Sequence, residues 1–308
     1  MNFKKKKQVL TIGYPYFVNR LQELGKGSDF IFKVLPRQRF RKWFTLLQTD
    51  LIYIIGGDLR PNRYYRFAFF LKKKIIMHWV GSDILATRDR QINGEKVCPL
   101  LLNKAVHWAE VDWTASELSA LGVRTQIMPL TPATFPDEAA PFPVKFVALT
   151  YLPPGKEEFY GEAQLTRLAA DLPEVLFLVA AALPAEIKKE WPSNLIPIGW
   201  VDNMAELYKE VTLLIRLTNH DGLSFMVLEA LAYGRQVIWS YPFEGVHQAR
   251  NYHELYQTVN EMYQTFLRGG LGLNHTGREV VRRFYNPQVV WERIDEGIRR
   301  VISGWGES

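Results

Sequence analysis

Two carboxylates, one just before a short apolar segment and one inside it, have a spacing that suits ligand binding. Asp221 precedes the segment, and Glu229 lies inside it, eight residues later. From Phe225 to Ala232 every residue except Glu229 is apolar, which predicts a helix buried on most sides. A buried, unpaired charge is costly, so Glu229 must find hydroxyl and N–H donors or face a cleft where a ligand supplies them. A structural carboxylate that backbone amides cap is the alternative.

The start of the same segment has the residue types of an anion-binding helix terminus. Gly222 allows close approach of the backbone, and Ser224 is a typical N-cap residue. The backbone N–H groups of the first turn, with Leu223 at its edge, form a site suited to a diphosphate. Gly234 fits the end of the helix, ahead of a further strand.

These residues carry a family resemblance. Residues 221–234 resemble the E-x7-E motif, with its trailing E-A-x-A-x-G, of group 1 retaining GT-B glycosyltransferases. The similarity continues through the next predicted strand and, more loosely, over the whole chain. It implies that Asp221 contacts hydroxyls of the donor sugar and that Glu229 holds the ribose. Asp221 is one methylene shorter than the glutamate usual at its position.

The resemblance also implies a cationic site for the donor diphosphate, after the first strand of the C-terminal half. Lys156 fits the lysine position of the family, whereas Tyr151 stands where an arginine is usual. Arg216 ends an otherwise apolar strand, so we expect it to supply the missing charge. A structural ion pair with Asp221 or Glu229 is the alternative for this arginine. The predicted donor-binding residues are Tyr151, Lys156, Arg216, Gly222, Leu223, Ser224 and Glu229.

The first half of the chain resembles the acceptor-binding side of the same family. A predicted strand contains His78 and runs into a small-polar turn at 81–83, where the family often has a histidine that contacts sugar or acceptor. Residues 13–14 resemble its first glycine turn, and Ser116 its strand-end serine. A core histidine and a helix-capping serine are the alternatives. The predicted acceptor-binding residues are Gly13, Tyr14, His78, Gly81, Ser82, Asp83 and Ser116.

Retaining enzymes of this family need no catalytic base that a sequence would reveal. The resemblance implies that the departing diphosphate assists attack by the acceptor on the same face of the sugar. Catalysis then rests on positioning and electrostatic stabilisation, which we assign to Asp221, His78, Lys156 and Arg216. The six histidines lack the spacing of a zinc site and Cys98 is the one cysteine, so we expect no metal, and no cofactor besides the nucleotide-sugar co-substrate.

The elements that must position these residues alternate between strand and helix. Short apolar runs separated by helical patterns predict parallel sheets with helices on both faces. In the first half, strands are expected at 8–13, 30–35, 50–56, 74–80, 111–115 and 125–130, with a helix at 16–24. In the second half, strands are expected at 145–152, 175–181, 195–201, 212–217 and 236–240, with helices near 160–171 and 204–210. Beyond Tyr252 the pattern is mainly helical.

Five prolines between residues 129 and 143 mark a domain boundary. We predict a Rossmann-like acceptor-binding domain at 1–135, a linker at 136–144 and a Rossmann-like nucleotide-sugar-binding domain at 145–285. The last residues, 286–308, are expected to form a helix that packs back on the N-terminal domain. The predicted fold class is α/β, GT-B, with two doubly wound domains that face a central cleft.

Charge is unevenly distributed along the chain. The net charge is +6, but residues 1–135 hold 22 Lys or Arg against 10 Asp or Glu, and the remainder holds 16 against 22. Segments 37–44 and 60–74 mix cations with Trp, Phe and Tyr, as surfaces that lie on anionic lipid do. Cationic side chains that cover a core face are the alternative. No RRM, KH or helix-turn-helix signature accompanies the charge, so no nucleic-acid partner is expected.

The apolar runs of the sequence fall far below the roughly 20 residues that span a bilayer. Lys4 to Lys7 look like the start of a signal peptide, but Gly13, Pro15 and Asn19 interrupt the apolar stretch that follows. We therefore expect a cytoplasmic protein, with peripheral attachment to the inner face of a membrane.

Together these features predict a metal-independent retaining glycosyltransferase of the hexosyltransferase type, in polysaccharide biosynthesis. It would move a sugar from a UDP- or GDP-sugar to a glycan or lipid-linked acceptor. A catalytically silent GT-B subunit that binds a sugar nucleotide or a partner is one alternative, which Asp221 and Tyr151 motivate. A sugar-nucleotide epimerase is another, and it would need further carboxylates or histidines.

Overall fold

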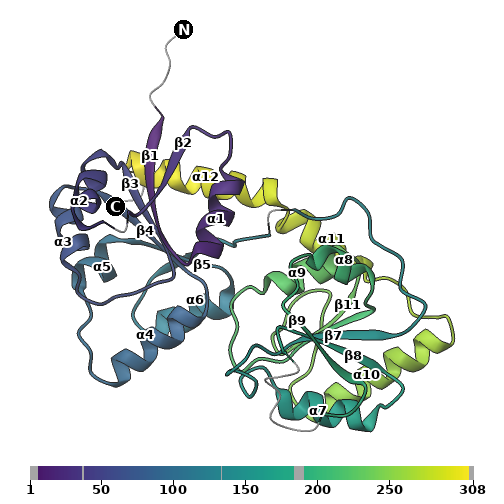
Figure 1. Ribbon diagram of the computed structural model, residues 1–308. Coiled ribbons are helices and arrows are strands. Elements are labelled where there is room, and N and C mark those ends of the chain that lie inside the picture. The colour runs from purple at the N-terminus through teal and green to yellow at the C-terminus, as the bar shows by residue number, and fades with distance from the viewer. Residues whose placement is uncertain (1–5, 37, 133, 184–190, 305–308) are drawn as a thin grey trace. The chain divides into compact units, whose positions relative to one another are not determined.

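The chain forms two units, each built on its own six-stranded parallel sheet (Figure 1). The computed structural model describes residues 6–36, 38–132, 134–183 and 191–304. Unit 1 consists of Met1–Ala133 and Pro287–Ser308, and unit 2 consists of Thr134–Asn286. The chain therefore leaves unit 1 once and returns to it at its C-terminal end.

The sheet of unit 1 has the strand order β2-β1-β3-β4-β5-β6. Its strands are β1 (Lys7–Gly13), β2 (Phe30–Val34), β3 (Leu51–Ile55), β4 (Lys74–Trp79), β5 (Val106–Ala109) and β6 (Thr125–Ile127). All five residues of β3 are buried, as a central parallel strand covered on both faces requires. The chain moves outward from β1 to β2 and then crosses to β3 on the other side of β1. The direction of winding therefore switches between β1 and β3.

Helices cover both faces of this sheet. They are α1 (Pro15–Leu24), α2 (Arg39–Gln48), α3 (Arg63–Phe70), α4 (Ser82–Ile92), α5 (Pro99–Lys104), α6 (Asp112–Ala120) and α12 (Pro287–Ser303). The final helix, α12, contacts α1 and β4. Gly297 brings α12 so close to the sheet that an added Cβ would lie 2.7 Å from the Trp108 ring. The last helix is thus an integral part of the core of unit 1.

The strand expected at 111–115 is wrong, because this segment begins a helix. Val111 is the extended residue before α6, and the Thr114 hydroxyl donates to its carbonyl oxygen at 2.8 Å. Side chains such as threonine that bond to the nearby backbone favour helix starts over strands. The strand instead is β5, whose His107 and Trp108 obscured its apolar pattern in the sequence.

The sheet of unit 2 has the strand order β12-β11-β10-β7-β8-β9, again entirely parallel. Its strands are β7 (Val147–Tyr151), β8 (Leu176–Ala180), β9 (Leu195–Gly199), β10 (Leu213–Arg216), β11 (Gln236–Trp239) and β12 (His247–Gln248). Strands β7, β8 and β9 build one side, after which the chain crosses back to place β10 beside β7. The switch in winding therefore lies between β7 and β10.

Helices also cover both faces of the second sheet (Figure 1). They are α7 (Glu162–Asp171), α8 (Met204–Lys209), α9 (Phe225–Ala232), α10 (Tyr252–Leu267) and α11 (His275–Phe284). Leu165 and Leu168 of α7 share one apolar core with Leu255 and Val259 of α10. Helix α9 packs instead against α11. The doubly wound arrangement predicted for this half is therefore present.

Arginines of unit 2 hold most of the segment that was predicted to be a linker. Arg235 is fully buried and donates to the carbonyl oxygens of Ala140 and Pro141. Arg278 donates to the Asp137 carbonyl oxygen at 2.5 Å. Burial lowers the pKa of Arg235 to about 10, because the charged guanidinium is removed from water. Residues 137–141 are thereby fixed to unit 2.

Candidate active site

The predicted donor-binding residues lie at the carboxyl edge of the unit 2 sheet, at its switch point. Tyr151 ends β7 and Arg216 ends β10, and these neighbouring strands are the two between which the winding reverses. Asp221 and Glu229 follow in the β10–α9 loop and in α9. Lys156, in the turn after β7, is exposed. The topology therefore positions these side chains where open parallel sheets bind ligands.

Arg216 and Asp221 form a bidentate ion pair. The Arg216 Nε donates to Asp221 Oδ2 at 2.5 Å, and its Nη2 donates to Oδ1 at 3.1 Å. The two side chains are only 11% and 13% exposed. Burial alone would lower the pKa of Arg216, but the adjacent Asp221 carboxylate outweighs it and raises that pKa above its ordinary value. The alternative stated for Arg216, an ion pair with Asp221, is what the structure contains.

Two aromatic side chains that the sequence analysis did not single out also hold Asp221. Trp239 of β11 donates its indole N–H to Asp221 Oδ2 at 3.2 Å. The backbone N–H of Asp221 donates to the Tyr241 hydroxyl, also at 3.2 Å. Because a buried indole N–H usually needs a partner, a tryptophan at the end of an apolar strand was the available signal. The carboxylate of Asp221 is therefore fixed from two sides.

Tyr151 and Tyr160 form an aromatic wall beside this ion pair. Their rings meet edge to face, with centroids 5.3 Å apart. The Arg216 guanidinium carbon lies 5.5 Å from the centroid of the Tyr160 ring, within the range of a cation–π contact. Burial raises the pKa of Tyr151, so this side chain is a neutral phenol near pH 7. At the position where the family that the sequence resembles usually has an arginine, this chain thus presents an aromatic surface.

The N-terminus of α9 has the predicted capping geometry. Ser224 has an extended backbone, and its hydroxyl oxygen accepts from the Val227 N–H at 3.4 Å. Gly222 and Leu223 are buried just before it. The prediction of Ser224 as the N-cap is confirmed. The positive end of the α9 dipole lies immediately after the Arg216–Asp221 pair along the chain.

Glu229 is half-buried in α9 and has a phenol as its partner. Its Oε2 accepts from the Tyr208 hydroxyl at 3.0 Å, and Tyr208 itself is almost fully buried in α8. The Tyr208 ring stacks on Tyr233, with centroids 5.5 Å apart. The structural alternative considered for Glu229 had proposed backbone amides rather than this tyrosine. A tyrosine 21 residues earlier on another helix gives no local signal in the sequence.

In unit 1, His78 is a core histidine. The ring is fully buried and its Nε2 lies 2.7 Å from the Met128 carbonyl oxygen, so Nε2 carries the proton and donates. Nδ1 then accepts from the Tyr53 hydroxyl, also at 2.7 Å. Burial lowers the pKa of His78 to about 4, which keeps the ring neutral. With both nitrogens engaged inside the protein, this geometry corresponds to the structural alternative for His78.

The turn after β4 is organised by a buried carboxylate. Asp83 accepts from the backbone N–H groups of Val80, at 3.1 Å, and of Gly57. Burial raises the pKa of Asp83 to about 6 despite these hydrogen bonds. Gly81 adopts a positive φ of 115° directly before α4, and Ser82 is exposed. Asp83 therefore binds the protein backbone and joins two loops at the carboxyl ends of β3 and β4.

Gly13 and Tyr14 lie at the switch point of unit 1. Gly13 has a φ of 151° and pairs with Ile55 across β1 and β3. A Cβ on Gly13 would lie 2.1 Å from the Ile55 carbonyl oxygen, so only glycine fits. Tyr14 is exposed beside Gly56. The predicted glycine turn thus occupies the ligand-binding edge of its sheet.

Ser116 does not end a strand. It lies in the middle of α6, and its hydroxyl donates to the Asp112 carbonyl oxygen at 2.9 Å. The expected position of Ser116 at a strand end is wrong for the same reason as the strand at 111–115, since the helix begins earlier than its apolar pattern indicates. Neither a strand end nor a helix cap describes this serine.

Within the described part of the chain, no three His, Cys, Asp or Glu side chains gather as a metal site would require. Across the same residues, no helix combines the length and the apolar character needed to cross a membrane.

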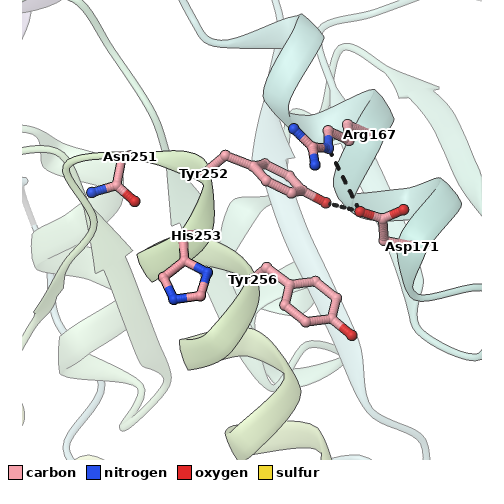
Figure 2. A pocket seen from close by; sticks show the side chains of 6 residues that line it. All are labelled: Arg167, Asp171, Asn251, Tyr252, His253 and Tyr256. Carbon is pink, nitrogen blue, oxygen red and sulfur yellow. Dashed lines mark hydrogen bonds and ion pairs between the residues drawn. The ribbon is translucent and has the colours of Figure 1, made fainter.

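A separate pocket of about 630 Å³ lies between α7 and α10 (Figure 2). The Tyr252 hydroxyl donates to Asp171, and the Arg167 guanidinium carbon lies 3.9 Å from the centroid of the Tyr252 ring. Asn251 caps α10 by accepting from the Glu254 N–H at 3.0 Å. None of the predicted site residues lines this pocket. The polar side chains of this pocket mainly connect α10 to α7 through these contacts.

Comparison with solved structures identifies the fold. HepE (Alr3699) of Anabaena, in complex with UDP and glucose, superposes with a TM-score of 0.69 over 96% of this chain and 99% of that one, at 11% identity. Sucrose-phosphate synthase (tll1590) of Thermosynechococcus elongatus has the same TM-score and identity, with 97% and 100% covered. The lipopolysaccharide outer core galactosyltransferase WaaB, in its apo form, has a TM-score of 0.66 and 13% identity, with 94% and 99% covered.

These similarities show that the chain has the GT-B glycosyltransferase fold, and the predicted fold class is confirmed. No protein-family model matches the sequence. No curated protein matches it either. The fold is therefore shared at identities of 11–13% for these three structures, and the activity has to be argued from the site.

Proposed function

We propose that this protein is a retaining glycosyltransferase that binds a nucleotide diphosphate sugar at the carboxyl edge of the unit 2 sheet. The observation that carries the proposal is the convergence of Arg216, the start of α9 and Glu229 at the switch point between β7 and β10. A guanidinium and a helix N-terminus together suit a diphosphate, and a half-buried carboxylate suits hydroxyl groups. HepE, a structure of the same fold, contains UDP and glucose.

The proposed roles follow the chemistry of each group. Arg216 and the exposed Lys156 neutralise the diphosphate, and the amides at the start of α9, around Leu223 and Ser224, bind its oxygens. Glu229 accepts from the ribose hydroxyls while Tyr208 keeps its carboxylate in place. Asp221 orients Arg216 and uses the remaining lone pair of Oδ1 to accept from a hydroxyl of the donor sugar.

In the proposed reaction, the bond between the anomeric carbon and the diphosphate breaks. An acceptor hydroxyl, on a glycan or a lipid-linked sugar, forms a new bond on the same face. The departing diphosphate takes the proton from that hydroxyl. Negative charge grows on the diphosphate as it leaves, so the cations and the helix dipole stabilise the transition state more than the ground state.

Turnover of the donor tests this function. Wild-type protein incubated with UDP- and GDP-sugars should release nucleotide diphosphate, and the anomeric configuration of the product, read by NMR, should match that of the donor. Inversion at the anomeric carbon would contradict the retaining mechanism. Glu174→Gln, which alters an exposed acid before β8 at the opposite edge of the unit 2 sheet, serves as a matched control and should leave turnover unchanged.

One observation favours a second candidate, a sugar-nucleotide-binding subunit without catalysis. Both oxygens of Asp221 already contact Arg216, and Tyr151 stands where the family has an arginine. A protein of this kind would bind UDP or GDP but release no sugar from any UDP- or GDP-sugar over days. Nucleotide binding together with turnover excludes this non-catalytic subunit. Nucleotide binding without turnover contradicts the glycosyltransferase proposal and supports the subunit instead.

A further inference from the structure

Helix α2 of unit 1 exposes most of its large apolar side chains. Phe40 is 84% exposed, and Trp43, Phe44 and Leu47 are exposed as well, whereas Leu46 is fully buried in the core. An amphipathic helix of a globular protein normally turns such residues inward. Contiguous exposed apolar surface of this kind marks an interaction site.

Helix α3 extends the same surface. Trp43 of α2 contacts the ring of Phe67, with centroids 5.3 Å apart, and Phe67 stacks on Phe70 at 6.0 Å. Phe70 is 78% exposed. Figure 1 shows α2 and α3 next to each other on unit 1. These exposed side chains form the α2–α3 surface, which consists of Phe40, Trp43, Phe44, Leu47, Phe67 and Phe70.

Cations surround the α2–α3 surface. Two pockets adjoin the α2–α3 surface. The first, of about 620 Å³, is lined by Arg63, Arg66 and Lys104 together with Phe67 and Phe70. The other, of about 490 Å³, is lined by lysines 6, 7 and 73 and by Asp50, together with Leu47. An aromatic and aliphatic centre is thus bordered by basic pockets on two sides.

The two segments that build this surface contain no acidic residue. Residues 30–49 and 59–82 hold eleven Lys or Arg and not one Asp or Glu. The acids that flank these segments in the sequence are paired with cations: Asp50 lies 3.4 Å from Lys7, and Asp58 lies 2.7 Å from Arg60. The net charge around the surface is therefore positive.

We propose that the α2–α3 surface docks unit 1 on an anionic phospholipid bilayer. The phenylalanines and Leu47 enter the boundary between headgroups and acyl chains, and the cations of the two pockets bind lipid phosphates. The geometry favours a bilayer because exposed aliphatic and aromatic groups project from a helix while the cations lie beside them. This inference is independent of the chemistry proposed for unit 2, and it stands or fails without it.

Vesicle co-sedimentation tests the docking. The full chain should bind vesicles of phosphatidylcholine with 30% phosphatidylglycerol at least about tenfold more tightly than pure phosphatidylcholine at low salt, and 0.5 M NaCl should reduce that preference. Equal binding to both vesicle types, or none at low salt, overturns the proposal.

The apolar part of the surface has its own variant. Phe40→Ser/Phe44→Ser/Phe70→Ser should weaken binding to the anionic vesicles at least about tenfold at either salt concentration, since each lost side chain removes buried apolar area. Unchanged binding by this variant contradicts insertion. Because the three side chains are exposed, its thermal unfolding should match that of the wild type, which shows that the variant is folded.

A matched control removes three exposed apolar side chains elsewhere, in Ile92→Ser/Trp200→Ser/Leu267→Ser. This control should bind vesicles as the wild type does. If the phenylalanine variant instead turns a dimer into a monomer by sedimentation velocity, or loses binding to single-stranded nucleic acid but not to vesicles, the surface serves a second copy or a nucleic acid and the bilayer proposal is wrong.

Discussion

Asp221 is the residue at which this chain departs most clearly from the E-x7-E pattern, and the structure gives a physical reason for its short side chain. Arg216 lies five residues earlier, at the end of β10, and its guanidinium meets the Asp221 carboxylate in a two-point contact. Trp239 bonds to the same carboxylate. The arginine that we propose as a substitute for the usual family arginine is therefore held by the acid that differs from the family's glutamate.

Removing the charge of Asp221 should destabilise the protein. Asp221→Asn leaves Arg216 buried without its counter-charge, which we expect to cost about 3 kcal/mol in the free energy of unfolding. Urea denaturation, monitored by tryptophan fluorescence, measures this free energy of unfolding. The control Glu174→Gln, on the surface, should stay within about 0.5 kcal/mol of the wild type. A loss below about 1 kcal/mol in Asp221→Asn would show that the ion pair is not formed in solution.

His78 gives the protein a defined dependence on pH. Its pKa is about 4 in the folded state and about 6.5 when unfolded, so between these values the unfolded chain binds more protons. The stability that the neutral His78 ring contributes is fully present above pH 6.5 and is lost as the pH falls through 4. The effect on the free energy of unfolding is about 3 kcal/mol. The difference in unfolding free energy between wild type and His78→Gln should shrink by that amount from pH 7 to pH 4. A difference that does not change with pH would contradict the buried neutral ring.

Asp83 acts with the opposite sign in nearly the same range. Burial raises its pKa from 3.8 to about 6, so the folded state binds more protons between these values and stability falls as pH rises through the window. The difference between wild type and Asp83→Asn should therefore grow in favour of the wild type as pH falls from 7 to 4. If both differences moved in the same direction, one of the two assignments would be wrong.

At the scale of elements, the start of α9 depends on one hydroxyl. Ser224→Ala removes the acceptor for the Val227 N–H and should cost about 1 kcal/mol, while Ser224→Asp should retain most of the stability. Ser116→Ala is the matched control, because Ser116 is exposed inside α6 and alanine is the better helix former there. Thermal unfolding of the three variants measures these differences in stability. Equal losses in both alanine variants would argue against the capping role.

The alternation of apolar runs was sufficient to predict most strands of both sheets, because a buried parallel strand needs a continuous apolar sequence. It failed at β5, where His107 interrupts the apolar run in the sequence although both of its ring nitrogens find hydrogen-bond partners in the core. It also failed at the start of α6, where Thr114 bonds to the backbone. Local sequence patterns therefore predict most strands of the two sheets but not every helix start.

The candidate site was predictable only in part, for a related reason. Ser224 and the apolar helix that follows it could be identified from neighbouring residues. The partners of the two carboxylates could not, because Tyr208 and Trp239 approach Glu229 and Asp221 from separate elements. His78 is similar, since its two hydrogen-bond partners lie 25 and 50 residues away along the chain. Contacts at such separations depend on topology rather than on local sequence.

At the scale of the whole molecule, the two units differ in charge and in the surfaces that they expose. The excess of cations lies in residues 1–135, where the α2–α3 surface is found, whereas the candidate nucleotide site lies in the more acidic remainder. Replacing four cations beside the α2–α3 surface with glutamine, at positions 41, 42, 63 and 66, should weaken binding to anionic vesicles at least about tenfold. The same change at positions 209, 250, 268 and 283 of unit 2 should have little effect on vesicle binding. Equal losses in the two variants would point to non-specific attraction by net charge.

The central claim is that unit 2 binds a nucleotide diphosphate through the residues around α9. Calorimetric titration of UDP into wild type, Glu229→Gln and the control Glu174→Gln tests it most directly. We expect saturable binding by wild type and the control, with affinity at least about tenfold weaker in Glu229→Gln, since a ribose hydroxyl loses a charged acceptor. If wild type binds neither UDP nor GDP, or if Glu229→Gln binds as tightly as wild type, the assignment of this site is contradicted.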